Sequence, residues 1–146
     1  MPSARRDDPY LNFNFLIEID GETVAGFSEV DLPEGRIEAV AYREGSDRTS
    51  AARLLPGRVA HGPLVLRRGF AGDPVLFQWW LAIAQGNLDR RNVSVVLLDE
   101  QRQEVARWNL RRAWPTKWGG PPLNARGNEV AIETLEVVHE GIELSD

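Results

Sequence analysis

The stretch LNFNFLIEID, residues 11–20, decides the fold of this chain. Its apolar residues fall at every second position and alternate with residues that are mostly polar. This period of two is typical of a β-strand that buries one face. The stretch ends in Asp20-Gly21, a dipeptide that accepts the positive φ angles of a tight hairpin turn. We therefore expect residues 23–30 to return antiparallel to the first strand.

Outward from this hairpin, the same reasoning predicts further strands separated by polar or glycine-rich turns. They are expected at residues 37–43, 63–68, 93–98, 104–114 and 129–143.

The last of these runs contains a conflict of phase. Val130 and Ile132 share one face of a regular strand, whereas Leu135 and Val137 share the other. One face cannot hold both pairs without an extra residue, so we expect a β-bulge near Glu133-Thr134.

Residues 45–58, GSDRTSAARLLPGR, show no sustained strand period and contain glycine, serine and proline. The stretch predicts a long loop. Loops of this length in a compact domain are usually functional or disordered.

A helix is predicted at about residues 74–85. Asp73 is a favourable N-cap, Pro74 suits the first helical position, and Gly86 suits the position after the last turn. These end signals enclose the run VLFQWWLAIAQ, which contains no strong helix breaker.

The predicted helix is too apolar for one buried stripe. Leu76, Trp80 and Ile83 share one face, with Trp79 beside it. Phe77 and Leu81 lie away from that face, where a solitary domain would tend to carry polar residues. We therefore expect Phe77 and Leu81 to form an outer or intersubunit surface.

Together these elements predict a mainly β fold. We expect one domain, residues 1–146, built as a β-barrel or sandwich of two packed antiparallel sheets with one flanking helix. A chain of 146 residues is long enough to bury a hydrophobic core of that kind.

The composition excludes several classes of function. The chain lacks cysteine, which rules out disulfides and thiolate sites, and its net charge of −5 argues against tight nucleic-acid binding. No apolar run is long enough to span a membrane, and no secretion signal is recognisable, so we expect no membrane insertion. Its two histidines occur in no metal or catalytic motif. We expect no cofactor, no metal and no enzymatic activity.

What remains is a surplus of apolar and aromatic surface, including five tryptophans. Such a surplus suits a subunit that its neighbours bury. A small barrel that holds a ligand would have a similar composition, and so would an enzyme with an unrecognised site.

An ordered set of short stretches adds a resemblance. The chain resembles the tail tube protein family of contractile phages and extracellular contractile injection systems, although residues 31–35 depart from the family's usual sequence. The matching stretches are DPYLNFNFLIEIDG at 8–21, GFSEV at 26–30, YREG at 42–45, LPGR at 55–58, LVLRRG at 64–69, RRNVSVVLLDE at 90–100, AWPTKW at 113–118 and LNARGNEVAIETLEVVHEG at 123–141.

The resemblance implies a structural subunit that forms sixfold rings, which stack into an inner tube around a lumen. The implied partners are further copies of the chain, a tail sheath, a baseplate hub and spike, and protein or DNA cargo in the lumen. Assembly would occur in the bacterial cytoplasm, before the tube becomes part of a phage tail or a released injection particle. A type VI secretion-like tube protein and a hub-proximal tube initiator share these features and stay open as alternatives. A small-ligand-binding β-barrel is a more distant one.

The resemblance also implies roles for individual residues. The family uses the region of residues 45–58 for ring-to-ring stacking, which suggests that role for Arg48, Arg53 and Arg58. In a closed ring, the polar side of the strands would face the lumen. That set is Asn12, Asn14, Glu18, Arg107, Asn109 and Arg111.

Overall fold

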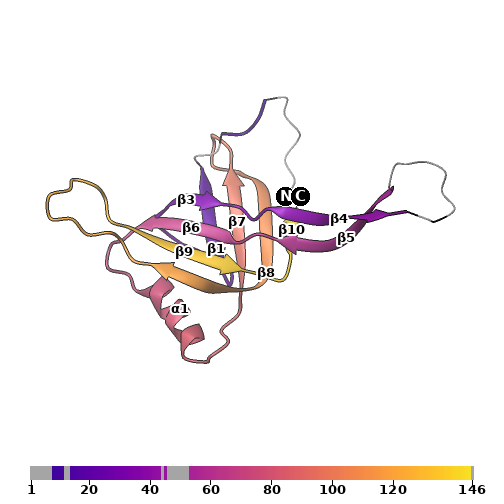
Figure 1. Cartoon of the computed structure of the whole chain (residues 1–146). Coiled ribbons are helices and arrows are strands. Elements are labelled where there is room, and N and C mark those ends of the chain that lie inside the picture. Colours follow the sequence, from indigo (N-terminus) through magenta and orange to yellow (C-terminus); the bar gives the residue numbers. More distant parts are fainter. Residues whose placement is uncertain (1–7, 12–13, 44, 46–52, 146) are drawn as a thin grey trace.

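The structure is a computed structural model that describes residues 8–11, 14–43, 45 and 53–145. Strands make up most of it, and a helix lies against one end of the strands (Figure 1). The elements are β1 (Phe15–Ile19), β2 (Glu22–Val24), β3 (Phe27–Asp31), β4 (Gly35–Tyr42), β5 (Arg53–His61), β6 (Leu64–Gly69), α1 (Val75–Ala84), β7 (Arg91–Leu98), β8 (Glu104–Gly119), β9 (Ile132–Val138) and β10 (Ile142–Ser145).

Among the described residues, eight strands form one antiparallel sheet in the order β2-β1-β7-β8-β9-β6-β3, with β10 also paired to β8. Strands β4 and β5 form a separate two-stranded ribbon. We call this ribbon the arm because it projects away from the other strands (Figure 1).

The long strand β8 folds the sheet into two layers. Its first part pairs with β7 and β10, and its residues 114–119 pair with β9. Between these parts Arg112 has a φ of 52°, and the register with β7 shifts between Arg91 and Val93. We call β2, β1, β7, β10 and the first part of β8 the β7 layer. The second part of β8 with β9, β6 and β3 is the β9 layer.

The core lies between these two layers and the helix. In the strands that supply this core, inward-pointing side chains alternate with outward-pointing ones, as the period of two requires. The buried cluster takes Ile17, Ile19, Val93, Val95 and Leu110 from the β7 layer, Leu64, Leu66, Leu135 and Val137 from the β9 layer, and Leu76 and Trp79 from α1. The prediction of two packed antiparallel sheets with one flanking helix is confirmed.

The first hairpin forms at Asp20-Gly21, where both residues have positive φ, but its second strand is shorter than predicted. Only β2 returns along β1. Gly26, with a φ of 91°, turns the chain away, and β3 then pairs with β6 in the other layer. The single strand predicted at residues 23–30 is therefore wrong, because the chain changes layer in its middle.

The loop predicted at residues 45–58 is wrong for residues 53–58. These residues belong to β5 and pair with β4 across the arm. Arg53 and Arg58 are thus strand residues and are exposed, while Arg48 lies outside the described residues. The run Leu54-Leu55 breaks the alternation of apolar and polar residues, because it places one leucine on each face of the ribbon.

The helix has the predicted ends. Asp73 Oδ1 accepts a hydrogen bond from the Val75 amide at 3.1 Å. At the other end, Gly86 has a φ of 94°, and its amide donates to the Ile83 carbonyl at 3.1 Å. The Asn87 amide donates to the Ala82 carbonyl at 2.9 Å. These two bonds form a Schellman motif, which glycine permits because it adopts positive φ without strain.

The phase of the helix differs from the prediction by one residue. Leu76 and Trp79 are its buried residues, whereas Trp80 and Ile83 are half-buried. The Trp79 indole donates to the Asp89 carbonyl at 2.7 Å, and the guanidinium of Arg91 lies 4.9 Å from its ring centroid. Trp79 is favoured inside because its one polar atom finds an acceptor there.

Glu133 explains the conflict of phase in the last long strand. In β9 the residues Glu133, Leu135 and Val137 are buried in alternation, and Val130 precedes the strand and is exposed. The register between β6 and β9 is unbroken through Glu133, so the bulge predicted near Glu133-Thr134 is wrong. The register shift lies in β8, between Pro115 and Lys117.

The carboxylate of Glu133 is buried because it has charged and polar partners. Arg68 Nε donates to it at 2.5 Å, and Trp118 Nε1 donates to its other oxygen at 3.0 Å. Arg68 also donates to the Asp73 carbonyl at 3.0 Å, which ties the start of α1 to β6. A buried ion pair is tolerated only when its remaining polar atoms are also bonded, as they are here.

Candidate assembly surfaces

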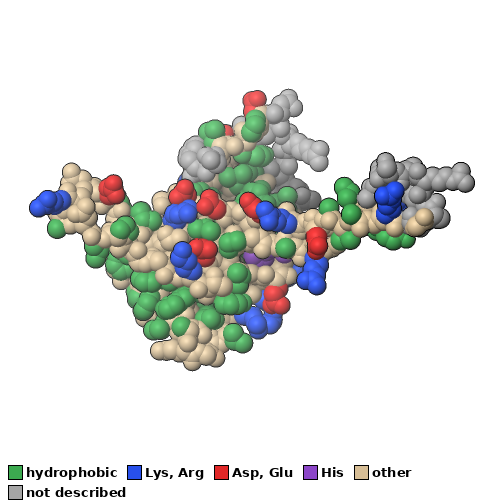
Figure 2. Space-filling view, viewed as in Figure 1, with side chains coloured by type: hydrophobic (Ala, Val, Ile, Leu, Met, Phe, Trp, Pro, Cys, Tyr) green, Lys and Arg blue, Asp and Glu red, His purple; other side chains and the backbone are tan. Residues whose placement is uncertain are grey.

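The arm carries one face that is apolar beyond its base. Residues that pair across two strands share a face, as do alternate residues along each strand. The pairs Ile37–Val59, Ala39–Pro56 and Ala41–Leu54 therefore lie on one side. Ile37 and Val59 are each 63% exposed and Leu54 is 71% exposed. Green side chains line the lower edge of the arm in Figure 2.

The arm has few contacts that could stabilise it within one subunit. Every residue of β4 and β5 is exposed, so the arm receives little cover from its own subunit. An isolated two-stranded ribbon is only marginally stable in water, and an uncovered apolar strand surface favours association. The arm therefore has the character of a surface that a second molecule covers.

The opposite face of the arm is mixed. It carries Arg36, Glu38 and Tyr42 on β4, with Val40 among them, and Arg53 near the far end of β5. A residue larger than glycine does not fit at position 57 without a shift of its neighbours. A Cβ there would lie 2.7 Å from Val40 Cγ2 and 3.2 Å from the Glu38 carbonyl oxygen.

The outer face of the β7 layer holds most of the predicted lumen residues. Glu18 pairs with Arg107 at 2.8 Å, and Arg107 also pairs with Glu104 at 2.8 Å. The Glu104 and Glu18 carboxylates raise the pKa of Arg107, and Arg107 in turn lowers the pKa of Glu104. The opposite directions of these two shifts indicate that Arg107 and Glu104 stabilise each other's charged form.

A second row of polar contacts crosses the same layer. Ser94 Oγ donates to Asn109 Oδ1 at 2.7 Å, and Asn109 Nδ2 donates to Ser145 Oγ at 2.9 Å. Arg111 pairs with Glu143, which lies opposite Asn109 in the register. The strands thus place Glu18, Arg107, Asn109 and Arg111 on one polar face, in three separate groups of contacts.

Two predicted lumen residues take no part in these contacts. Asn14 binds the β7–β8 turn instead: it donates to the Asp99 carbonyl at 3.2 Å and accepts from Arg102 at 3.3 Å. Asn12 lies outside the described residues. The face is also not wholly polar, because Val96, opposite both Leu16 and Arg107, is buried within it.

Besides the two strands of the arm, three described strands leave one edge unpaired at the ends of the layers. Strands β2 and β10 end the β7 layer on opposite sides, and β3 ends the β9 layer. Each edge presents free backbone N–H and C=O groups that can pair with another chain.

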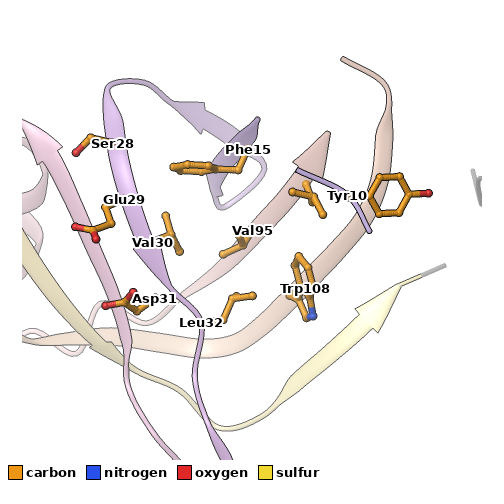
Figure 3. A pocket seen from close by; sticks show the side chains of 10 residues that line it. Tyr10, Phe15, Ser28, Glu29, Val30, Asp31, Leu32, Val95 and Trp108 are labelled. Atoms are coloured by element: carbon orange, nitrogen blue, oxygen red, sulfur yellow. The ribbon is translucent and has the colours of Figure 1, made fainter. Parts of the chain in front are cut away.

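An open cleft of about 540 Å³ lies between β3 and the β7 layer. Figure 3 shows Phe15, Val30, Val95 and Trp108 pointing toward one another across it, while Glu29 and Asp31 point to the other side of β3. Both carboxylates bind Arg67, at 3.3 and 3.1 Å. The cleft is therefore mainly apolar, and the described acidic groups closest to it are directed away from its interior. A site for catalysis or for orienting a small ligand normally needs convergent polar groups.

The predicted outer residues of the helix are half-buried. Phe77 packs edge-on against Trp118 of its own subunit, with ring centroids 4.8 Å apart, and lies 6.1 Å from Trp80. Leu81 is partly exposed. Within the described part of the chain, no helix is long and apolar enough to cross a membrane.

These features define a structural class: a two-layered β subunit with uncovered strand edges and an uncovered apolar arm. Over residues 11–143 the sequence matches the family described as the T4-like virus tail tube protein gp19. The chain belongs to that family. It is a phage tail tube-like structural protein. No curated protein is detectably similar to it in sequence.

Solved structures share the fold over nearly the whole chain. A chain of the anti-feeding prophage baseplate is 26% identical, with a TM-score of 0.83 and coverage of 96% of this chain and 97% of that one. A chain of the PVC extracellular contractile injection system sheath–tube complex is 20% identical, with a TM-score of 0.84 and coverage of 95% and 93%. Hcp1 from Flavobacterium johnsoniae is 14% identical, with a TM-score of 0.55 and coverage of 89% and 93%.

Proposed function

We propose that this protein is the inner tube subunit of a contractile phage tail-like injection system and that it assembles into stacked hexameric rings. The uncovered apolar face of the arm carries the proposal. A subunit that exposes such a ribbon gains stability when another copy covers it. Membership of the tail tube family supports the same assembly.

Ring closure uses the two free edges of the β7 layer. In the order β2-β1-β7-β8-β10, one edge lies at each end of the layer, so an edge of one subunit meets the other edge of the next. Such a head-to-tail interface closes into a ring when its rotation returns to the start. The polar face of Glu18, Arg107, Asn109 and Arg111 then lines the lumen.

Stacking of rings uses the arm. Its apolar face covers part of a subunit in the next ring, and Arg53 and Arg58, with Arg48, supply charged contacts. The outer surface near Phe77 and Leu81 meets a neighbouring subunit or the tail sheath. A baseplate hub and spike complete one end of the tube.

In this role the protein performs no chemistry and acts as one domain, residues 1–146. It conducts protein or DNA cargo through its lumen and assembles in the bacterial cytoplasm before release in a phage tail or injection particle. The type VI-like alternative has weaker support, because the Hcp1 fold agrees less well, with a TM-score of 0.55.

A double substitution in the arm tests the proposal. Ile37→Gln with Leu54→Gln removes apolar area from the proposed stacking face. Leu88→Gln is a matched control, because Leu88 is 60% exposed and lies outside the arm, in the part of the subunit formed by the two layers and α1, which we call the body. We expect the control to form tubes in negative-stain micrographs and the double variant to form rings or monomers with an unchanged circular dichroism spectrum. Tubes of normal length from the double variant would contradict the role of the arm. Monodisperse monomers from the unmodified protein would favour a ligand-binding barrel or an enzyme.

A second candidate is a hub-proximal tube subunit that starts the tube. The 26% identity to a baseplate chain exceeds the 20% identity to a chain of the sheath–tube complex. Gold labelling of an affinity-tagged subunit in purified particles separates the two roles. Labels along the whole length identify the main tube subunit, and labels at one end identify the initiator.

A further inference from the structure

The two histidines of the chain meet where the arm leaves the body. His61 is the last residue of β5 and pairs with Gly35, so it lies at the base of the apolar arm face. His139 directly follows β9 in the body. Their ring centroids are 5.2 Å apart, with the rings tilted by 50°. Figure 2 shows this contact as a purple patch at the base of the arm.

One hydrogen bond of His139 is possible only while its ring is neutral. Its Nδ1 accepts a hydrogen bond from the Gly141 amide at 3.2 Å, which leaves the ring proton on Nε2. Nε2 is buried and has no hydrogen-bond partner among the described residues. A proton added to this ring would remove the acceptor for Gly141 and place a charge in a poorly solvated position.

The charged groups around His139 do not offset such a charge. Burial lowers the pKa of His139 and the neighbouring His61 lowers it further, against an opposing effect from the backbone of Gly62 and Gly141.

The carboxylates on the adjoining elements are bound to arginines. Glu140 pairs with Arg112, and Glu143 pairs with Arg111, whose guanidinium packs against Gly141. In the segment that leads into the arm, Glu34 lies 3.9 Å from Arg36.

We propose that the His61–His139 contact is an acid-sensitive latch that holds the base of the arm against the body. While both rings are neutral, they pack together and fix the direction in which the arm leaves the body. When they are protonated, two cations lie side by side, the described carboxylates on the adjoining elements are already bound to arginines, and the contact opens.

The direction of the pH dependence follows from the lowered pKa of His139. A group whose folded pKa is depressed prefers the folded state when it is neutral, so the latch is fully stabilising above the ordinary histidine pKa of about 6.5. That stabilisation is lost as the pH falls below this value toward the folded pKa. Under the proposed function, acid therefore loosens the stacking of rings before it unfolds the subunits.

Hydrogen exchange on the unassembled full-length protein tests the latch independently of tube formation. Exchange is compared at about pH 7.5 and about pH 5.5, on either side of the ordinary histidine pKa, after correction for the intrinsic rate. We expect amides of β4 and β5 to exchange about tenfold faster at the lower pH, while those of β7 change less than about twofold. Equal corrected rates in the arm at both pH values would overturn the latch.

Two variants and one control assign the effect to the histidines. His139→Gln should remove the pH dependence of arm exchange. His61→Gln removes the cationic neighbour, so the midpoint of the acid-induced opening should move to higher pH, and this variant decides the matter if His139→Gln does not fold. Glu140→Gln should leave the midpoint unchanged, because Glu140 is bound to Arg112. A His61→Gln midpoint equal to that of the unmodified protein contradicts the proposal.

Discussion

Strand β6 and strand β4 of the arm both carry apolar residues at alternate positions, yet these residues are buried in β6 and exposed in β4. In β6, Leu64 and Leu66 are completely buried between the layers. In β4, the equally regular alternation of Ile37, Ala39 and Ala41 faces water. The sequence period is the same in both places, and only the presence of a covering layer differs. The two layers are therefore stabilised by contacts within one subunit, whereas the arm receives little cover from the described part of its own chain.

The largest loss of stability is expected from a substitution in the core of the body. Trp79→Ala should lower the free energy of unfolding by about 3–5 kcal/mol, because it leaves a large cavity and an unpaired Asp89 carbonyl. Urea unfolding of an assembly-deficient form measures this change. Trp80→Ala is the matched control, since Trp80 is only half-buried, and its effect should be clearly smaller. Equal losses from both variants would show that the helix packs in another phase.

A loss of about 3 kcal/mol is expected from Glu133→Leu, which leaves the buried guanidinium of Arg68 with only the more distant Asp73 carboxylate, at 3.5 Å. The double variant Arg68→Met with Glu133→Leu should recover most of the lost stability, because the poorly paired buried charge is then absent. Thermal unfolding of the single and double variants measures the difference. If the double variant is no more stable than the single one, shape and the Trp118 bond matter more than charge.

A smaller effect is expected on the polar face of the β7 layer. Arg107→Gln removes two partly exposed ion pairs and should cost about 1 kcal/mol or less. Because the pKa of Glu104 is lowered in the folded protein, this contribution is present near neutral pH and is lost as the pH falls through the acidic range. The unmodified and variant proteins should therefore approach each other in stability at acidic pH. A constant difference across the pH range would mean that packing of the arginine is responsible.

The smallest effect on an unassembled subunit is expected in the arm. Leu54→Gln should change its free energy of unfolding by less than about 0.5 kcal/mol, because Leu54 is exposed. The same substitution should raise the protein concentration needed for tube assembly, which light scattering reports. A large loss of subunit stability would show that the arm is covered by its own chain.

How far the sequence predicts this molecule depends on whether local or distant partners decide each residue's position. The alternation of residues 11–20 predicts β1 correctly, because its buried face is set by the strand period alone. Glu133 defeats the same reasoning, since its place in the core depends on Arg68 from another strand. The conflict of phase between Ile132 and Leu135 signalled that something unusual occurs there, but a buried charge was not the expected solution.

The predictions for the arm and the helix were wrong for other reasons. In β5 the sequence LLPGR contains a proline and a glycine, which usually mark loops, and its register depends on the pairing with β4. In the helix, Trp79 and Trp80 are adjacent and equally apolar, so the period cannot decide between them. The alternation did place Arg107 and Asn109 on one face of β8, because a regular strand fixes that relation locally. Glu18 of β1 shares this face through the pairing of both strands with β7. The assignment of that face to a lumen is a prediction that depends on assembly.

The shared strand β8 has a consequence for how the subunit folds. Since its 16 residues complete the hydrogen bonding of both layers, neither layer can form a closed unit while the other is absent. The chain should therefore fold in a single cooperative transition, without a populated intermediate that contains only one layer. For a growing polymer this is useful, because a half-formed subunit could add at an open edge and then offer no complete edge to its successor. Cooperativity within one chain would thus keep defective units from terminating the polymer.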